Sequence, residues 1–450
     1  MPRVLLTTLG TGSYVEGSYI LKGQTSSCTP FIQEALAEIL CRSWNSQDRI
    51  VVFCTEAARK THWINGGMFD PGLESRLKNL SVPPAIESVG IPDGRSEAEI
   101  MEIFDTVYSV LKHEDEVILD ITHSFRSLPL LNAVILNYSK VLKNIHVAAI
   151  YYGAFETLGP LESVRNLPLE CRQAPVFDLT PYDTLLEWSV AVDDFARHGW
   201  TVRLQSLVSR EVSPILRETR GKNETVRILD RLSRRLHQMG LNILTARCPE
   251  IEKFNSLSSL VDSIKGQQVI PPLNPLLDLL SSKTKPFETA SPEEKGFEAV
   301  EWCVAHNLVP QGYTILRETL ISGLCRLLDK DLKSRTERED FVGSLLNVVG
   351  QRKQPTDWKG ELADRRKEAE AIVKRLGPPF QDLADAFQGI RDRRNDINHG
   401  GCGKGCTTAD RLIQDLGEKL IHARKAWNEI VKCTAAGQSD SPGPGSNISE

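Results

Sequence analysis

The segment Val117-Ile118-Leu119-Asp120-Ile121-Thr122-His123-Ser124-Phe125-Arg126-Ser127-Leu128-Pro129 carries the clearest structural signal in this chain. It opens with an apolar run that is typical of a buried strand, and acidic, hydroxyl, imidazole and guanidinium groups follow where that strand ends. A helical pattern of apolar residues begins after Phe125. The order strand, polar turn and helix predicts one repeating unit of an α/β sheet.

The same alternation of strand and helix signals runs through the first 180 residues. Because each apolar run is short and continuous, the strands are expected to be buried on both sides, as in a parallel sheet. We therefore expect an open, parallel, Rossmann-like α/β sheet with helices on both faces. The other expected strands are Val4–Leu9, Ile50–Cys54, Ala85–Val89 and Ile145–Tyr152, and the expected helices include Thr29–Trp44 and Ser96–Leu111.

The sequence from about Pro181 onward predicts helices only. Two irregular segments, 266–291 and 352–360, are expected to be surface loops, and residues 435–450 are expected to be a disordered tail. The predicted organisation is a sheet domain over 1–180, an all-helical domain over 181–434, and the tail. The expected helices are Tyr182–His198, Val202–Glu218, Glu224–Ala246, Glu252–Ser263, Pro292–His306, Gln311–Leu328, Ala363–Leu376, Phe380–Asn398 and Asp410–Cys433.

Composition and charge narrow the class of protein. With 450 residues, 40% of them hydrophobic and 25% charged, the chain reads as an ordinary globular protein of two to three domains. No stretch approaches the roughly 18 apolar residues that a membrane helix needs, and Met1-Pro2-Arg3-Val4 begins a strand rather than a signal peptide. We therefore expect a cytoplasmic protein. The net charge of −5 means that any site for RNA must be local.

The cysteines do not indicate a disulfide framework or a metal site. Ten of them are scattered along the chain, many within apolar runs, as expected for reduced thiols. Cys402 and Cys406 lie close together, but a second pair of ligands nearby is missing, so zinc is not favoured. No metal cofactor is expected.

A second polar strand end follows the first predicted strand. Leu9, Gly10, Thr11, Gly12 and Ser13 form a segment of mostly small residues, whose backbone N–H groups can approach a phosphate closely. The third glycine and the helix of a dinucleotide fingerprint are missing, which argues against a dehydrogenase. In a doubly wound sheet, ligands bind at the carboxyl ends of the strands, so this segment and the turn after Asp120 predict a ligand pocket.

The turn after Asp120 has several interpretations. Thr122 or Ser124 can cap the following helix, with Asp120 bonded to backbone. The density of polar groups favours a pocket for phosphate and base instead. A serine hydrolase is not favoured, because Ser124 and His123 are neighbours on a turn and no Gly-x-Ser-x-Gly elbow is present. Slow cleavage of a bound ring phosphodiester, promoted by Thr122, His123 or Arg126, remains open.

Near the C-terminus, the motif Arg394-Asn395-Asp396-Ile397-Asn398-His399 stands at the expected end of a helix, before Gly400-Gly401. RNA cleavage without a metal requires groups that move protons and groups that stabilise charge on the phosphate. Histidine is suited to the first task by its unperturbed pKa of about 6.5, and arginine to the second by its planar set of donors. The motif therefore indicates a candidate ribonuclease site.

The same motif also has a purely structural interpretation, because basic residues complement the negative end of a helix and Gly400 suits a left-handed cap. In an ideal helix Arg394 and His399 point about 140° apart, whereas Asn395 and His399 share a face. One copy of the motif converges poorly on one phosphate. We therefore expect a composite site built by two copies across a dimer axis.

Taken together, these segments resemble the CRISPR-associated accessory ribonucleases of type III systems, in which an N-terminal CARF domain precedes a C-terminal HEPN domain. The Asp-x-Thr-His-x-Phe-Arg-x-x-Pro pattern of residues 120–129 is the most specific part of the resemblance. The other parts are Leu9-Gly10-Thr11-Gly12, Cys54-Thr55-Glu56-Ala57, Asn307–Tyr313 leading into Arg317-Glu318, and the Arg394-to-His399 motif.

The resemblance implies a ribonuclease switched by a second messenger. A CARF domain of this family binds cyclic oligoadenylate, here tetra- or hexa-adenylate, and the HEPN dimer then cleaves single-stranded RNA without a metal. Arg394, Asn395 and His399 correspond to the catalytic motif, and Arg391, Arg393, Arg394 and Lys404 are candidates for a local basic strip. The implied ligand-binding residues are Leu9, Gly10, Thr11, Gly12, Ser13, Thr55, Thr122, His123, Ser124, Phe125 and Arg126.

The resemblance also implies a homodimer or higher homo-oligomer with no membrane association. We expect ligand binding to shift the paired Arg394 and His399 residues into cutting geometry, which requires the ring to bind the active state more tightly than the resting state. Two alternatives stay open. One is a ring nuclease that only degrades its messenger, and the other is a regulator that binds cyclic oligoadenylate without ribonuclease activity.

Overall fold

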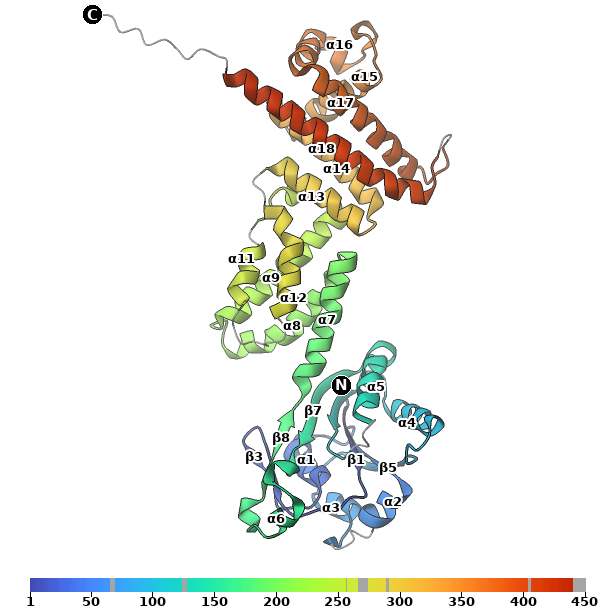
Figure 1. The fold of residues 1–450 in the computed structure, drawn as a ribbon, viewed down its shortest axis with the longest axis vertical. Helices are drawn as coiled ribbons and strands as arrows, with labels where there is room; N and C mark the ends of the chain where they lie inside the picture. Colours follow the sequence, from blue (N-terminus) through green and yellow to red (C-terminus); the bar gives the residue numbers. More distant parts are fainter. Residues whose placement is uncertain are drawn as a thin grey trace, which may run out of the picture. The chain divides into compact units, whose positions relative to one another are not determined.

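The computed structural model describes residues 1–64, 69–123, 128–255, 257–265, 274–288, 291–403 and 406–439. The chain divides into two compact units, Met1–Leu186 and Glu187–Glu450 (Figure 1). The division falls inside helix α7 (Thr180–His198), close to the boundary expected at residue 180. We call these units 1 and 2 and describe each by itself.

The described residues of unit 1 form one eight-stranded sheet with the order β3-β2-β8-β7-β6-β1-β4-β5. The expected strands are present with bounds within one residue of the expectation, but the expectation of a purely parallel sheet is wrong. Strand β8 runs antiparallel to β7, and β3 antiparallel to β2 through a turn at Lys22 and Gly23, both with positive φ. Antiparallel neighbours need no crossover helix, so the helix-strand alternation did not reveal them. The strands are β1 (Arg3–Leu9), β2 (Ser18–Leu21), β3 (Gln24–Thr25), β4 (Arg49–Cys54), β5 (Ala85–Gly90), β6 (Glu116–Asp120), β7 (His146–Gly153) and β8 (Gln173–Asp178).

Helices cover both faces of the sheet, as expected. Leu5 and Leu9 of β1 belong to the apolar core beneath α1 and α3, whereas Val4 and Leu6 belong to the core beneath α4 and α5. Successive residues of a strand face opposite sides, so one buried strand contributes to both cores. The helical elements of unit 1 are α1 (Ile32–Leu40), η1 (Cys41–Ser43), α2 (Glu56–Ala58), η2 (Arg59–Ile64), α3 (Leu73–Asn79), α4 (Glu97–Val110), α5 (Leu128–Lys143), η4 (Phe155–Leu158), α6 (Leu161–Arg165) and η5 (Leu169–Cys171).

The strand order creates a switch point at the middle of the sheet. Strand β1 pairs in parallel with β4 on one side and with β6 on the other, and the chain moves outward from β1 in both directions. The carboxyl ends of β1 and β6, at Leu9 and Asp120, therefore lie side by side. In open α/β sheets this is where a ligand-binding crevice forms.

Unit 2 is helical throughout its described residues. Most of the expected helices are present, and the bounds of α8 match the expectation. The elements are α8 (Val202–Glu218), α9 (Glu224–Leu244), α10 (Cys248–Ile251), α11 (Leu257–Ile264), α12 (Asn274–Thr284), η7 (Lys285–Glu288), α13 (Pro292–Ala305), α14 (Val309–Leu327), η8 (Thr336–Gly343), α15 (Ser344–Gly350), η9 (Pro355–Asp357), α16 (Glu361–Asp364), α17 (Arg366–Asn398) and α18 (Ala409–Ser439).

Three expectations for this unit need correction. The surface loop expected over 266–291 contains α12, because Leu277 and Leu280 lie one helical turn apart and are buried in the core. The helix expected over 252–263 is shorter: α11 begins at Leu257, and the separate short helix α10 ends at Ile251, before the expected range. The sequence predicts a disordered tail from residue 435, but α18 continues to Ser439; residues 440–450 lie outside the described residues.

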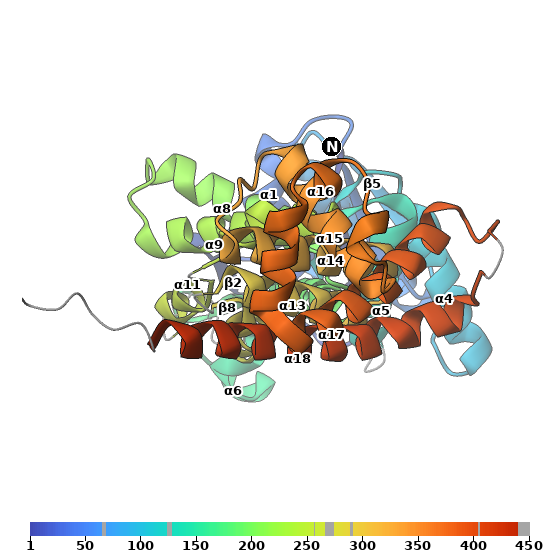
Figure 2. The ribbon, with the colours of Figure 1, turned by 90° about the horizontal axis from the view of Figure 1, so that it is seen from above.

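The long helix α17 is two helices joined at a sharp break, as the pattern predicted. Gly377 has φ 61° and ψ −151°, a conformation that favours glycine, and Pro378 and Pro379 start the second half. The segment that ends in the motif therefore begins at Pro378. α17 packs against α18, and α18 also packs against α13 and α14 (Figure 2).

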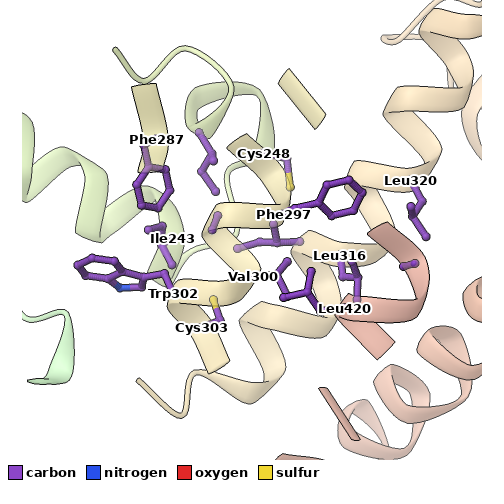
Figure 3. Packing of buried hydrophobic residues seen from close by; sticks show 14 of the residues in the cluster. Ile243, Cys248, Phe287, Phe297, Val300, Trp302, Cys303, Leu316, Leu320 and Leu420 are labelled. Carbon is purple, nitrogen blue, oxygen red and sulfur yellow. The ribbon is translucent and has the colours of Figure 1, made fainter. Parts of the chain in front are cut away.

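The core of unit 2 is centred on α13. Figure 3 shows Phe297 and Val300 of this helix beside residues of its neighbours, namely Leu316 and Leu320 of α14 and Leu420 of α18. Phe297, Leu316 and Leu320 are fully buried, so they anchor α14 and α18 and, through them, the end of α17. All ten cysteines are free. None of the described helices combines the length and the apolar character needed to cross a membrane.

Candidate functional site

A buried hydrogen-bond network joins the ends of β1, β6 and β7. Asp120 is 1% exposed and accepts from the Thr7 hydroxyl at 2.6 Å and from the Thr122 backbone N–H at 3.0 Å. The Thr122 hydroxyl also donates to Asp120 at 2.5 Å, and it accepts from the Gly153 N–H at 2.8 Å. The carboxylate therefore fixes the turn that leads out of β6, and the turn is tied to β7.

An aromatic cluster of Tyr14, Phe31, His62 and His123 lies beside this network. The Tyr14 ring meets both imidazoles edge to face, with centroids 4.7 Å from His62 and 4.9 Å from His123. Tyr14 also donates its hydroxyl to the Gly10 carbonyl at 3.1 Å. This hydroxyl holds the glycine segment against the turn after β6.

Both histidines of the cluster are held in the neutral form. Burial lowers the pKa of His62, and it lowers the pKa of His123 despite the opposing charge of Asp120. The Nε2 atom of His62 contacts the Gly12 carbonyl at 3.1 Å. The Nε2 atom of His123 is enclosed and has no hydrogen-bond partner among the described residues. Its hydrogen-bonding capacity is therefore unused by the described residues.

A cavity of about 500 Å³ opens between these strand ends. Its volume lies within the range of small-molecule sites. Tyr152 and Glu156 close one side, and their hydrogen bond of 2.5 Å raises the pKa of Tyr152 to about 12, so the tyrosine stays protonated. The lining residues are Gly12, Ser13, Tyr14, Val15, Tyr19, Pro30, Thr122, His123, Tyr152, Gly153, Phe155, Glu156, Gly159, Pro160 and Leu161. We call this the strand-end cavity.

The structure brings part of the predicted ligand set to this cavity. Gly12, Ser13, Thr122 and His123 line it, and Gly10 lies next to His123. Three other predicted residues do not line it: Leu9 is in the core, Thr11 is exposed on the loop, and Thr55 caps α2 by accepting from the Ala58 N–H. Ser124, Phe125 and Arg126 lie outside the described residues.

Sequence reasoning missed the wall that follows β7. Tyr152, Gly153 and Glu156 come from the end of this strand and the turn after it. The sequence signal that could have indicated this wall is Tyr151-Tyr152-Gly153, two tyrosines followed by a glycine at a strand end. Position 153 favours glycine for a steric reason: a Cβ there would lie 2.2 Å from Ile32 Cδ1 and 3.3 Å from the Thr122 hydroxyl oxygen.

The C-terminal motif ends α17 in a Schellman cap. Gly400 and Gly401 have φ of 63° and 72°, and their N–H groups donate to the carbonyls of Ile397 at 3.0 Å and Asp396 at 3.1 Å. The structural interpretation of Gly400 as a left-handed cap is therefore confirmed. It does not account for the exposed side chains of Asn395 and His399.

Asn395 and His399 line a cavity of about 560 Å³ between the end of α17 and α18. Lys419 of α18 reaches into it over Gly389, where a Cβ would come within 2.7 Å of the lysine Nζ. Asp396 holds the loop between α17 and α18 by accepting from the Thr407 N–H at 2.9 Å. We call this the motif cavity; its lining is Gly389, Asp392, Arg393, Asn395, Asp396, His399, Gly403, Cys406 and Lys419.

Arg394 does not line the motif cavity. Its Nε is enclosed without a hydrogen-bond partner among the described residues, and its charge acts on Glu339 of η8. The pKa of Glu339 is lowered first by the hydrogen bond from Arg317, opposed by burial, and then by the charges of Arg317, Arg338 and Arg394. Arg394 and His399 thus point to different sides of one helix, as their spacing predicts.

Two arginines of the expected basic strip make contacts within the chain. Arg393 pairs with the buried Asp415 at 2.8 Å, and Arg391 donates to Asn347 at 2.7 Å. Lys404 lies outside the described residues, whereas Lys419 was not predicted. Among the residues that the structure covers, no cluster of three or more His, Cys, Asp and Glu side chains could hold a metal.

Comparison with known proteins agrees with the resemblance that the motifs carry. The chain is related in sequence to a CRISPR-associated protein. That relative is CRISPR-associated protein MJ1674 of Methanocaldococcus jannaschii, 26% identical over 338 residues that cover 72% of this chain and 47% of the relative. The chain therefore spans about half the length of the curated relative it matches.

Among solved structures, Enterococcus italicus Csm6 bound to cyclic hexa-2′-fluoro-hexa-dAMP aligns with a TM-score of 0.47 and 11% identity, over 98% of this chain and 99% of the other. No protein-family model matches the chain.

Proposed function

We propose that the chain is a ribonuclease of type III CRISPR defence that cleaves single-stranded RNA when cyclic oligoadenylate is bound. In this proposal unit 1 is a CARF domain and unit 2 contains a HEPN domain. The observation that carries the proposal is the motif cavity, where His399 is exposed at the end of a helix and Arg394 stands five positions before it.

The proposed chemistry uses these side chains without a metal. His399 transfers protons between the ribose 2′-hydroxyl and the leaving 5′-oxygen, and a guanidinium stabilises charge on the phosphate oxygens. Because Arg394 lies on another side of α17, the guanidinium that faces His399 comes from the second copy in a dimer. Lys419 adds a cation at the same cavity.

The strand-end cavity is the proposed activator site. Its glycine segment offers backbone N–H groups for phosphate, and the unpartnered His123 Nε2 can bond an adenine or a ribose. A ring of adenylates with two-fold symmetry suits a dimer, since each copy offers the same pocket to half of the ring. Binding of the ring switches the ribonuclease on only if the ring binds the active state more tightly than the resting state.

A second candidate function for the same cavity is ring cleavage, and the unpartnered His123 Nε2 favours it. The neutral imidazole can accept a proton from a ribose hydroxyl of the bound ring. Thr122 is less suited to act on the ring, because its hydroxyl is engaged with Asp120 and Gly153.

One assay separates these functions. Labelled single-stranded RNA is incubated with the full chain in EDTA, with and without cyclic tetra- or hexa-adenylate, and both RNA and ring are followed. RNA cleavage only with the ring supports the proposal. Loss of the ring without RNA cleavage supports the ring nuclease alone, and neither event supports a binding regulator.

The site assignment is tested by His399→Ala, which should abolish RNA cleavage and leave ring affinity unchanged. His422→Ala is a matched control, because His422 is also exposed on unit 2 but lies outside the motif cavity. RNA cleavage by His399→Ala at the wild-type rate would exclude the site.

A further inference from the structure

A third cavity of about 390 Å³ lies in unit 2, beside the irregular segment 352–360. Its floor is apolar and includes the ring of Trp358, which is 6% exposed and donates its indole N–H to the Lys353 carbonyl at 3.3 Å. Arg352, Lys353 and Lys374 stand around it. We call this the Trp358 cavity. It has an apolar floor and a rim of basic side chains.

The side chains of the two rim lysines, Lys353 and Lys374, take no part in the ion pairs that stabilise the described fold. Both are exposed, and no ion pair to either is present within the described part of the chain. Arg352 pairs with Asp385 at 2.8 Å, and Glu370 is the acidic residue among the lining residues. The two lysine side chains, unpaired among the described residues, leave a local excess of positive charge at this cavity, which suits an anionic ligand.

The Trp358 cavity lies on the same face of α17 as the motif cavity. Gln381 lines the first and His399 lines the second. They are separated by about five full turns of the second half of α17, so their side chains project in the same direction at levels about 27 Å apart. Two acids on this face are paired, Asp385 with Arg352 and Asp392 with Arg391, and Asp396 accepts from the Thr407 N–H.

We propose that the Trp358 cavity is an anchoring site for the RNA strand, in which Lys353 and Lys374 bind a backbone phosphate and the apolar floor contacts the adjoining nucleoside. This rests on the proposed ribonuclease function. A stacked strand advances about 3.4 Å per nucleotide, so a strand that spans both cavities needs roughly eight nucleotides between the anchored and the cleaved phosphates. The site thereby favours long substrates over short ones.

The test compares the Lys353→Ala/Lys374→Ala double variant with Lys359→Ala/Lys367→Ala in the full chain. Lys359 and Lys367 are exposed and near in sequence, but they do not line the cavity, so the control changes the charge equally. Binding of fluorescent 20-nucleotide and 5-nucleotide RNAs is measured in EDTA without activator, at several salt concentrations. Thermal melts verify that both variants fold.

We expect the test variant to raise the Kd of the 20-nucleotide RNA about tenfold and that of the 5-nucleotide RNA by less, because a short strand can still bind at the motif cavity alone. The magnitude of the slope of log K against log salt should fall by about 0.7, since each neutralised phosphate of a single strand contributes about 0.7. Unchanged binding of the long RNA, an equal loss for both lengths, or an equal effect of the control variant would overturn the inference. Failure of wild-type cleavage with intact length-dependent binding would instead refute the proposed ribonuclease.

Discussion

Thr7 of β1 donates its hydroxyl to Asp120 of β6 at 2.6 Å, and both side chains are 1% exposed. Through this bond the two strands that flank the switch point share one buried carboxylate. The same carboxylate orients Thr122 on the wall of the strand-end cavity. The polar group that shapes the candidate ligand site is therefore also part of the sheet.

We expect Asp120→Ala to destabilise unit 1 by about 1–3 kcal/mol, because it leaves the buried Thr7 hydroxyl without a partner. Asp120→Asn keeps an acceptor oxygen and should cost less. The measurement is urea-dependent hydrogen exchange of the β1 amides. Equal effects of the two variants would show that the acceptor oxygen is not what stabilises the turn.

Two glycines of the strand-end cavity should respond differently to alanine. Gly153→Ala introduces a Cβ that must displace Ile32, so it should lower the melting temperature of unit 1. At Gly12 a Cβ meets no atom within 4 Å, so Gly12→Ala should leave stability unchanged. Gly12→Val reaches further into the cavity and should weaken cyclic oligoadenylate binding, measured by calorimetry. Wild-type affinity in Gly12→Val would argue against that cavity as the ring site.

The stability of unit 1 should fall as the pH is lowered through about 6.5. Burial lowers the pKa of His62 and of His123, so the unfolded chain binds more protons than the folded one just below the ordinary histidine pKa. The contribution of the two neutral histidines to the free energy of unfolding is complete above this pH and is lost below it. The loss is at most about 1.4 kcal/mol per pH unit for each histidine.

Hydrogen exchange of the β6 amides between pH 5 and 8, corrected for the intrinsic rate, measures this dependence. A His62→Gln/His123→Gln variant should show a flatter profile, and a variant of the exposed His113 should follow the wild type. Identical profiles for all three proteins would contradict the prediction.

Glu339 should affect RNA cleavage through Arg394. Its carboxylate is held by Arg317 and lies within the electrostatic reach of Arg394, whose Nε is enclosed without a partner in the described chain. We expect Glu339→Gln to lower kcat by about five- to tenfold, equivalent to roughly 1–1.4 kcal/mol, with little change in KM. Glu339→Asp should recover part of the loss.

Arg394→Lys distinguishes a charge from a shaped donor at this position. A lysine keeps the charge and loses the planar set of donors, so we expect activity close to that of Arg394→Ala. Substantial cleavage by Arg394→Lys would indicate that charge alone is enough.

The order of strands and helices in both units could be read from periodicity. Buried β-branched runs gave the strands of the parallel part, and the apolar repeat gave α8 to the residue. The break in α17 was visible in Gly377-Pro378-Pro379, because backbone conformation at glycine and proline is a local property. The antiparallel strands β3 and β8 were not visible, because their partners lie far along the chain or need no helix between them.

At the candidate sites too, the sequence predicts some features and the tertiary structure decides others. The residue types at Asp120, Thr122 and His123 and in the Arg394-to-His399 motif predict the chemistry, since proton transfer and phosphate binding depend on the functional groups themselves. Their surroundings follow from packing. The Thr55 hydroxyl caps α2, α18 brings Lys419 to the cavity that His399 lines, and Asp415 pairs with Arg393. Which groups remain free for a ligand depends on contacts between segments distant in sequence, and only the folded chain forms these contacts.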